Sequence, residues 1–349
     1  MRVVLQDEVF GSHADRLELL HIFAFGYQNR HQILTEPMYQ PEKEGRSDSG
    51  LRDWMSSLPV GLREEVEFTL KMGIAALSEA KTKDEIEVVS GKESNWSGST
   101  PQLTVEDARR LLGRSLHLLV ENARNDRQFL ETMGRRLLGP EYWEPLQEAV
   151  NEQWLHYEHG GGIGSMKNAV EELADDPVAG IRTWVMFDSD APKPGKPSEQ
   201  SESLLEACEQ CEVDHHQLRR RAIENYLPQS ALEASAQSVS GRSKTARREA
   251  AAAFAEMNQE QRNHFDMKKG FRRAGDESEE PGEVEEPPDF FDDVPLDDRK
   301  TLAGGFGKKI GDLFHDSNQP GWEHWLQEEF APQEKDEFIE IYETIYRKL

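Results

Sequence analysis

The stretch Trp184-Val185-Met186-Phe187-Asp188-Ser189-Asp190 predicts a buried strand that leaves the core carrying two carboxylates. Side chains of a strand alternate between its two faces, so Asp188 and Asp190 are expected on one side and Ser189 on the other. Two carboxylates this close repel each other unless a proton or a metal ion lies between them. Mg²⁺ is commonly held by one or two such groups together with water and phosphate. The stretch therefore predicts a divalent-metal site at the end of a strand.

A second apolar run, Leu116-His117-Leu118-Leu119-Val120, ends in Glu121 and predicts another strand. Between the two runs lie a helical pattern, the glycine turn 159–164 and a further helix over 165–173. This rhythm is typical of an α/β core with a parallel sheet, in which active residues follow the carboxyl ends of the strands. We therefore expect Glu121 to meet the two aspartates at one edge. Three carboxylates there could bind one or two Mg²⁺ ions, which activate water and polarise a phosphodiester.

The charge of the chain restricts how it could meet nucleic acid. Among 349 residues, 41 Lys and Arg stand against 67 Asp and Glu, which gives a net charge of -26. The segment 276–298 alone carries twelve acids and no base. Bulk charge therefore does not attract nucleic acid, and any such contact must be local or supplied by a partner.

The compartment is predicted from cysteine usage and hydropathy. Cys208 and Cys211 are the two cysteines of the sequence, which excludes a disulfide scaffold and favours a reducing cytosol. The first residues become acidic before an apolar core of signal-peptide length develops. No apolar run approaches the roughly 18 residues needed to cross a bilayer. We expect a cytoplasmic protein that does not enter a membrane.

Three regions are predicted along the chain. Residues 1–100 are expected to form a helical N-terminal region that ends in a polar linker, with helices over about 15–34, 51–58 and 61–80. Residues 101–230 form the α/β core. Residues 231–349 form a helical C-terminal region, in which the acidic segment 276–298 is expected to be mobile.

The core motifs together resemble a TOPRIM domain, the metal-binding module shared by topoisomerases, bacterial primases and OLD-type nucleases. The resemblance rests on Leu118-Leu119-Val120-Glu121 with Asp126 and a following helix, on the glycine turn, and on Val185-Met186-Phe187-Asp188-Ser189-Asp190. The later segment Arg221-Ala222-Ile223-Glu224-Asn225-Tyr226-Leu227 adds to it. Within the group, the chain is most similar to TOPRIM effectors of bacterial anti-phage systems, which often act with an ABC-type ATPase.

The resemblance implies a fold, a site and an activity. It implies a TOPRIM-like parallel sheet between helical regions, with Glu121, Asp188 and Asp190 as catalytic metal ligands and Glu224 as a further ligand. The cofactor would be Mg²⁺, with Mn²⁺ as an alternative, and the reaction would be cleavage of DNA or of RNA such as tRNA. Such a nuclease would act in antiviral defence by abortive infection, controlled by a partner ATPase; a homo-oligomer is left open. The family usually has glycine where Asn122 stands, so Asp126 is given no role.

Other interpretations of these residues remain open. An apolar strand followed by Asp-x-Asp also suits a glycosyltransferase that uses a nucleotide-sugar, and this would not require Glu121. A non-catalytic subunit of a defence complex could keep the fold without the activity. The glycine turn 159–164 lacks the ending of a P-loop but could approach a phosphate through backbone amides. Cys208, Cys211, His215 and His216 resemble a zinc site, but positions 208, 211 and 215 also share one helical face, so a half-buried helix face explains them without a metal.

Overall fold

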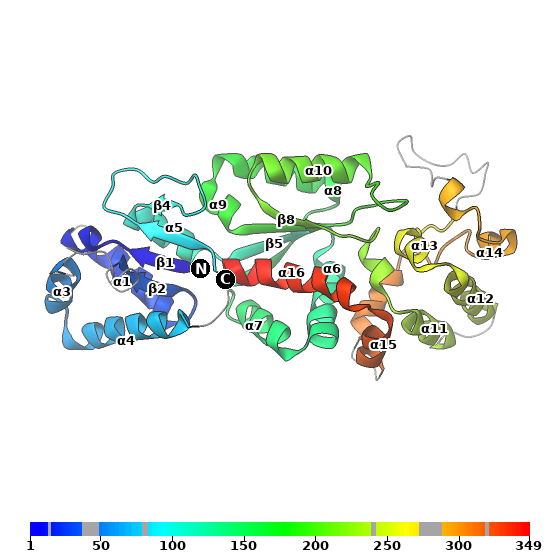
Figure 1. Ribbon diagram of the computed structural model, residues 1–349, viewed down its shortest axis with the longest axis horizontal. Helices are drawn as coiled ribbons and strands as arrows, with labels where there is room; N and C mark the ends of the chain where they lie inside the picture. The colour runs from blue at the N-terminus through cyan, green and yellow to red at the C-terminus, as the bar shows by residue number, and fades with distance from the viewer. Residues whose placement is uncertain (13–14, 37–48, 79–82, 239–241, 272–287, 318–320) are drawn as a thin grey trace.

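Two four-stranded parallel sheets, each flanked by helices, form the two α/β units of the computed structural model (Figure 1). The structure describes residues 1–12, 15–36, 49–78, 83–238, 242–271, 288–317 and 321–349. Within these residues, no helix is both long and apolar enough to cross a membrane.

The N-terminal unit contains a parallel sheet, which differs from the purely helical region that the sequence predicts. Its strands are β1 (Arg2–Leu5), β2 (Gln32–Thr35), β3 (Glu85–Val88) and β4 (Gln102–Leu103), in the order β2-β1-β3-β4. Its helices are α1 (Arg16–Tyr27), α3 (Ser49–Ser56), α4 (Val60–Ala76) and α5 (Val105–Gly113), with the short η1 (Asp7–Gly11). The strands are too short to show a period of their own beside strongly helical neighbours.

The second unit contains the sheet that the motifs predict. Its strands are β5 (Leu116–Val120), β6 (Leu155–His159), β7 (Thr183–Phe187) and β8 (Asp214–Gln217), in the order β6-β5-β7-β8. The helices between them are α6 (Ala123–Thr132), the π-helical η2 (Met133–Leu138), α7 (Pro140–Asn151), α8 (Ile163–Glu172), η3 (Leu173–Asp175), α9 (Pro177–Ile181) and α10 (Glu199–Gln210). Strands β5 and β7 are adjacent and parallel, and Val120 pairs with Met186.

Both faces of this sheet are covered, as a parallel sheet requires. Leu119 of β5 with Val185 and Phe187 of β7 pack against α8 and α10. The alternate residues, including Leu118 and Met186, pack against α6 and the C-terminal helix α16 (Pro332–Lys348). Figure 1 shows α8 and α10 on one side of the sheet and α7 and α16 on the other. The strands that carry the predicted site are therefore central and rigid.

The C-terminal region is helical, as predicted. It comprises η4 (Ile223–Tyr226), α11 (Gln229–Ser238), α12 (Arg242–Glu256), α13 (Gln259–His264), η5 (Pro288–Phe291), α14 (Leu296–Thr301), η6 (Ile310–Asp316), α15 (Trp322–Glu329) and α16. Of the acidic segment predicted to be mobile, residues 276–287 lie outside the described residues. The remainder is ordered, because η5 buries Phe291 and α14 begins at Leu296.

The two sheets meet at their amino-terminal edges. Arg182, which precedes β7, is fully buried and donates through Nε to the carbonyl oxygen of Arg114 before β5. Asp84, which precedes β3, donates its backbone N–H to the carbonyl oxygen of Arg347 in α16 at 3.0 Å. Val178 of α9 is buried in the core of the N-terminal unit. The carboxyl edges of the two sheets consequently point to opposite ends of the molecule, and both chain termini lie at the centre (Figure 1).

Candidate active site

Glu121 and Asp188 meet at the carboxyl edge of the second sheet. Each is the first residue after its strand, and the two strands are neighbours. Oε1 of Glu121 accepts a hydrogen bond from the backbone N–H of Asp188 at 3.0 Å. The sequence prediction that these two acids lie at one edge of the sheet therefore agrees with their placement.

The loop that follows β7 holds Asp190 in a left-handed conformation, with φ of 48°. This region is costly for most non-glycine residues and is more accessible to Asp. The backbone N–H of Asp190 donates to the carbonyl oxygen of Arg221 at 2.8 Å, and the hydroxyl of Ser189 donates to that of Arg220 at 2.8 Å. Oδ1 of Asp188 accepts from the N–H of Ile223 at 3.2 Å. The chain thus leaves the strand before Asp190, and the segment after β8 fixes the loop.

That segment also brings Glu224 into the site. The Glu224 side chain is only 3 % exposed, and its Oε1 lies 3.0 Å from Nζ of Lys268. Its Oε2 is buried without a hydrogen-bond partner among the described residues. Gly311 of η6 approaches closely: a Cβ there would lie 2.8 Å from Oε1 of Glu224. The carboxylate therefore sits in a tight cradle with one oxygen unsatisfied, which is costly unless a further ligand completes it.

Asp126 supports the turn that carries Glu121. Its Oδ2 accepts from the backbone N–H of Asn122 at 2.7 Å. The side chain of Asn122 in turn accepts from the N–H of Arg124 and of Asn125 and caps α6. The residue that stands where the TOPRIM family has glycine is thus an ordinary helix cap. Asp126, given no role from the sequence, fixes the backbone beside Glu121.

The carboxylates of this edge are poorly neutralised. Burial raises the pKa of Glu121 to about 8, and the nearby charges of Asp190 and Asp126 add to the rise. Burial likewise raises the pKa of Asp126 to about 7. For Asp188, burial and then Glu121 raise the pKa well above its usual value, and burial also raises that of Asp190. Such shifts cluster at functional sites because a charge there lacks a counter-ion.

Lys268 forms an ion pair with Glu224 in this cluster, and Arg221 acts on Asp190. Burial alone would lower the pKa of Lys268, but the carboxylates of Glu224 and Asp188 more than offset this and raise it. Its positive charge in turn lowers the pKa of Glu121 and Asp190. Its side chain is 41 % exposed, so the site opens to solvent on this side. Nothing in the sequence around Lys268 indicates which acids it will meet.

The arginines Arg219, Arg220 and Arg221 form ion pairs within the fold. Arg220 pairs with Glu334 at 2.5 Å and lies over the rings of Tyr226 and Phe330. Arg221 pairs with Asp266 at 3.0 Å. Arg272 and Arg273 lie outside the described residues, and Arg247 and Arg248 of α12 are exposed. Beside the carboxylates themselves, Lys268 offers a cation to a phosphate.

The carboxylates of this cluster suit a hard divalent cation, although their present positions do not form a complete set of ligands for one. Carboxylate oxygens are the preferred ligands of Mg²⁺, and the orphaned Oε2 of Glu224 is a free donor. In the described part of the chain, however, no three His, Cys, Asp or Glu side chains are arranged to ligate one ion as they stand. Glu121, Asp188, Asp190 and Glu224 could hold Mg²⁺ or Mn²⁺ after side-chain rotation, with Lys268 moving aside or sharing the cluster.

The glycine turn lies at the same edge, after β6. The N–H of Gly160 donates to the carbonyl oxygen of Val120 at 2.7 Å, directly before Glu121.

The cysteines give no comparable site. Cys208 is buried in α10, where burial raises the pKa of its thiol to about 12. A thiol held protonated in an apolar core is a poor zinc ligand.

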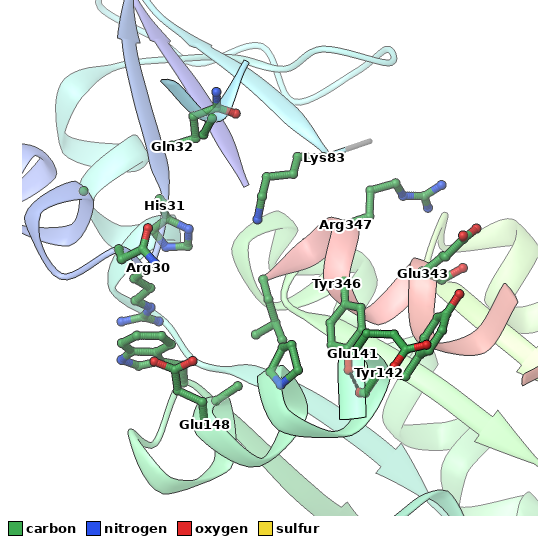
Figure 2. A pocket seen from close by; sticks show the side chains of 18 of the residues that line it. Arg30, His31, Gln32, Lys83, Glu141, Tyr142, Glu148, Glu343, Tyr346 and Arg347 are labelled. Carbon is green, nitrogen blue, oxygen red and sulfur yellow. Dashed lines mark hydrogen bonds between the residues drawn. The ribbon is translucent and has the colours of Figure 1, made fainter. Parts of the chain in front are cut away.

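A cavity of about 1320 Å³ lies elsewhere, between the two units. Figure 2 shows Arg30, His31 and Lys83 on the side of the N-terminal unit, facing Glu148 of α7 and Glu343 of α16. This cavity adjoins the amino-terminal edges of the sheets, whereas ligands of parallel α/β sheets bind at the carboxyl edges. We therefore place the candidate site at the carboxylates.

Comparison of the chain with family models, with curated proteins and with solved structures found no match.

Proposed function

We propose that this chain is a divalent-metal-dependent nuclease whose catalytic residues are Glu121, Asp188 and Asp190, with Glu224 as a further metal ligand. The observation that carries the proposal is the direct contact between Glu121 and the backbone of Asp188, in a cluster of acids whose pKa values are raised. The acids come from separate parts of the sequence and are gathered by the strand order. Repulsion among them has no structural benefit unless a cation is to be bound.

The residues of the site would have separate roles in the reaction. Bound Mg²⁺ would supply Lewis acidity, polarising a phosphodiester and activating water. Glu121 is held through Oε1, which leaves Oε2 to bind the metal or to accept a proton. Asp188 is fixed through Oδ1 by the Ile223 N–H, which orients its other oxygen. Asp126 acts through the backbone at Asn122, so it is a positioning residue rather than a catalytic one.

The substrate class follows from chemistry and charge together. A metal at a cluster of acids serves phosphoryl chemistry, and Lys268 at the rim offers a cation to a phosphate. At a net charge of -26, the chain is poorly suited to find DNA or RNA unaided. We propose that a partner, such as the ABC-type ATPase implied by the TOPRIM resemblance, delivers the nucleic acid, and that the chain is the effector of an anti-phage defence system.

One rival is favoured by a specific observation. The ammonium of Lys268 already pairs with Glu224, so the cluster could be a vestigial site that lysine neutralises. The chain would then be a non-catalytic subunit of TOPRIM-like fold. The glycosyltransferase alternative gains nothing comparable, because it leaves the contact between Glu121 and Asp188 without a purpose.

The test is a cleavage map with isosteric variants. The chain is expressed as wild type and as Glu121→Gln/Asp188→Asn/Asp190→Asn, and total RNA and genomic DNA are sequenced for new ends. Amides should be tolerated, because the raised pKa values mean that the fold already favours the neutral carboxyls. Glu340→Gln, in the exposed pair with Arg219, is the matched control.

The end maps separate the candidates. New ends in the wild type and the control that vanish in the triple variant would support the nuclease and identify its substrate. If the three maps coincide while the triple variant still protects cells from phage, the non-catalytic subunit is the better account.

A further inference from the structure

Exposed large apolar side chains are concentrated on two adjacent helices of the N-terminal unit. Among the described residues, eight such side chains are exposed, and seven of them belong to α1 and α4. They are Leu17, Tyr27, Val60, Leu62, Phe68, Met72 and Ile74. The eighth is Leu296 in α14. Single exposed apolar residues need no explanation, and Met72 lines the cavity between the two units. Phe68 and Tyr27, however, contact each other and form one exposed apolar patch across the two helices, which is typical of an interaction site.

Phe68 lies at the middle of the outer face of α4. The inner face of α4 buries Val66, Leu70 and Gly73, which lie on the opposite side of the helix from Phe68. The Phe68 ring is 49 % exposed and meets the Tyr27 ring edge-on, with centroids 5.7 Å apart. Figure 1 shows α4 along the outer edge of the N-terminal unit. The apolar centre of this face is therefore presented to solvent.

The polar residues around Phe68 have a self-complementary order. Glu64 and Lys71 are both exposed and lie on the same side of the outer face, about 10 Å apart along the helix. Neither makes an ion pair with another described residue. Gly61, one turn before Glu64, leaves this end of the face flat, and a Cβ there would meet nothing. The face is thus acidic toward one end, basic toward the other and aromatic at its centre.

We propose that this face is a dimer interface, in which α4 packs antiparallel against α4 of a second copy about a two-fold axis at Phe68. In an antiparallel pair with this axis, a residue four positions before Phe68 faces the residues three to four positions after it. Glu64 of each copy then lies opposite Lys71 of the other. An isologous interface requires such self-complementarity, and the order of charges on α4 supplies it.

A second copy fits this face better than an unrelated helix. Two symmetric ion pairs flank a central pair of aromatic rings, which is the arrangement of a buried anchor inside a polar rim. Tyr27 of α1, whose ring contacts Phe68, widens the apolar centre of the face. The interface lies in the N-terminal unit, away from the carboxylate cluster, so the dimer presents two open sites. The proposal does not depend on the function of that cluster.

The experiment is sedimentation of the full chain across the micromolar range with matched variants. We expect the wild type to be a dimer and Phe68→Glu to be a monomer. Leu296→Glu, which changes the exposed apolar residue outside the patch, should remain a dimer. Glu64→Lys and Lys71→Glu each turn two attractive pairs into repulsive ones and should weaken dimerisation about tenfold. The combined Glu64→Lys/Lys71→Glu chain should recover the wild-type affinity.

Recovery of the affinity in the combined variant would identify the partner as a second copy of this chain, because the charges of an unrelated partner would not be exchanged by the same mutations. A monomeric wild type would overturn the proposal, as would a dimer that survives Phe68→Glu. A combined variant no tighter than the single ones would overturn the antiparallel register. The charge variants keep the test valid if Phe68→Glu does not fold, since both residues are exposed.

Discussion

The raised pKa of Glu121 makes the stability of the metal-free chain fall as the pH rises. The pKa is about 8 in the folded chain and near 4.5 when the residue is unfolded. Between these values the folded state keeps a proton that the unfolded state has released. Rising pH therefore favours unfolding, and the slope for one proton is about 1.4 kcal/mol per pH unit. Asp126 acts in the same direction, with a pKa of about 7 against 3.8.

The perturbation that isolates this effect is Glu121→Gln. Over the interval from about pH 5 to pH 7, Glu121 and Asp126 together would cost about 3 kcal/mol per pH unit, and the raised pKa values of Asp188 and Asp190 act in the same direction. The amide removes the part due to Glu121, so the slope of the variant should be shallower by about 1.4 kcal/mol per pH unit. At pH 7 the gain relative to pH 5 approaches about 3 kcal/mol, an upper value because the two carboxyls interact and the site can relax.

The assay is urea unfolding in EDTA at several pH values, followed by near-ultraviolet circular dichroism. Glu340→Gln, with a side chain 60 % exposed, is the control and should keep the wild-type slope. Adding Mg²⁺ should flatten or reverse the slope, because a metal binds the deprotonated carboxylates and stabilises the folded state more at high pH. The reasoning is refuted if Glu121→Gln and wild type have equal slopes, or if wild-type stability rises through this interval.

Three further predictions follow from contacts around the site. Lys268→Met should tighten Mn²⁺ binding about tenfold in calorimetry, because it removes a competing cation from the carboxylates; unchanged or weaker binding would show that the ammonium does not compete. Glu337→Ala should lower the free energy of unfolding in urea by about 3 kcal/mol, because the donors on His216, Arg219 and Tyr226 lose a buried acceptor. Glu340→Ala, in the exposed pair with Arg219, should lower it by less than about 1 kcal/mol, and equal losses in the two variants would contradict this. Gly311→Ala should weaken Mn²⁺ binding, because its Cβ would displace the carboxylate of Glu224. Gly304→Ala, where a Cβ meets nothing, should leave the affinity unchanged. Equal affinities of the two variants would show that the close approach of Gly311 does not matter for metal binding.

The central strands were predictable from sequence and the edge strands were not. β5 and β7 are buried on both faces and appear as continuous apolar runs. β6 (Leu155–His159) and β8 (Asp214–Gln217) form the two edges, are largely polar, and carry no periodic signal. β2 was absorbed into a predicted helix over 15–34, because its apolar residues continue the pattern of α1. The chain leaves that helix at Asn29, where φ is 58°.

The site was predictable where it depends on strand ends and unpredictable where it depends on distant contacts. Glu121 and Asp188 follow recognisable strands, so the topology of a parallel sheet brings them together. The Asp-x-Asp spacing suggested strand alternation for Asp190, but the strand ends at Phe187 and the backbone turns. The pairing of Lys268 with Glu224 spans more than forty residues, and no local pattern encodes a contact of that range.

The C-terminal region belongs to the site rather than lying beside it. The hydrophobic core of the second sheet extends from Leu116 to Ile345 without a break between the predicted regions 101–230 and 231–349. Glu337 of α16 accepts hydrogen bonds from His216, Tyr226 and the backbone of Arg219, and so fixes both ends of the segment that carries Glu224. A chain cut near residue 230 would keep Glu121 and the two aspartates in sequence, yet lose the helix that positions Glu224 and the lysine that neutralises it. The carboxylate cluster and the helical region therefore share one hydrophobic core, and a movement of α16 would reach the cluster through the hydrogen bonds of Glu337.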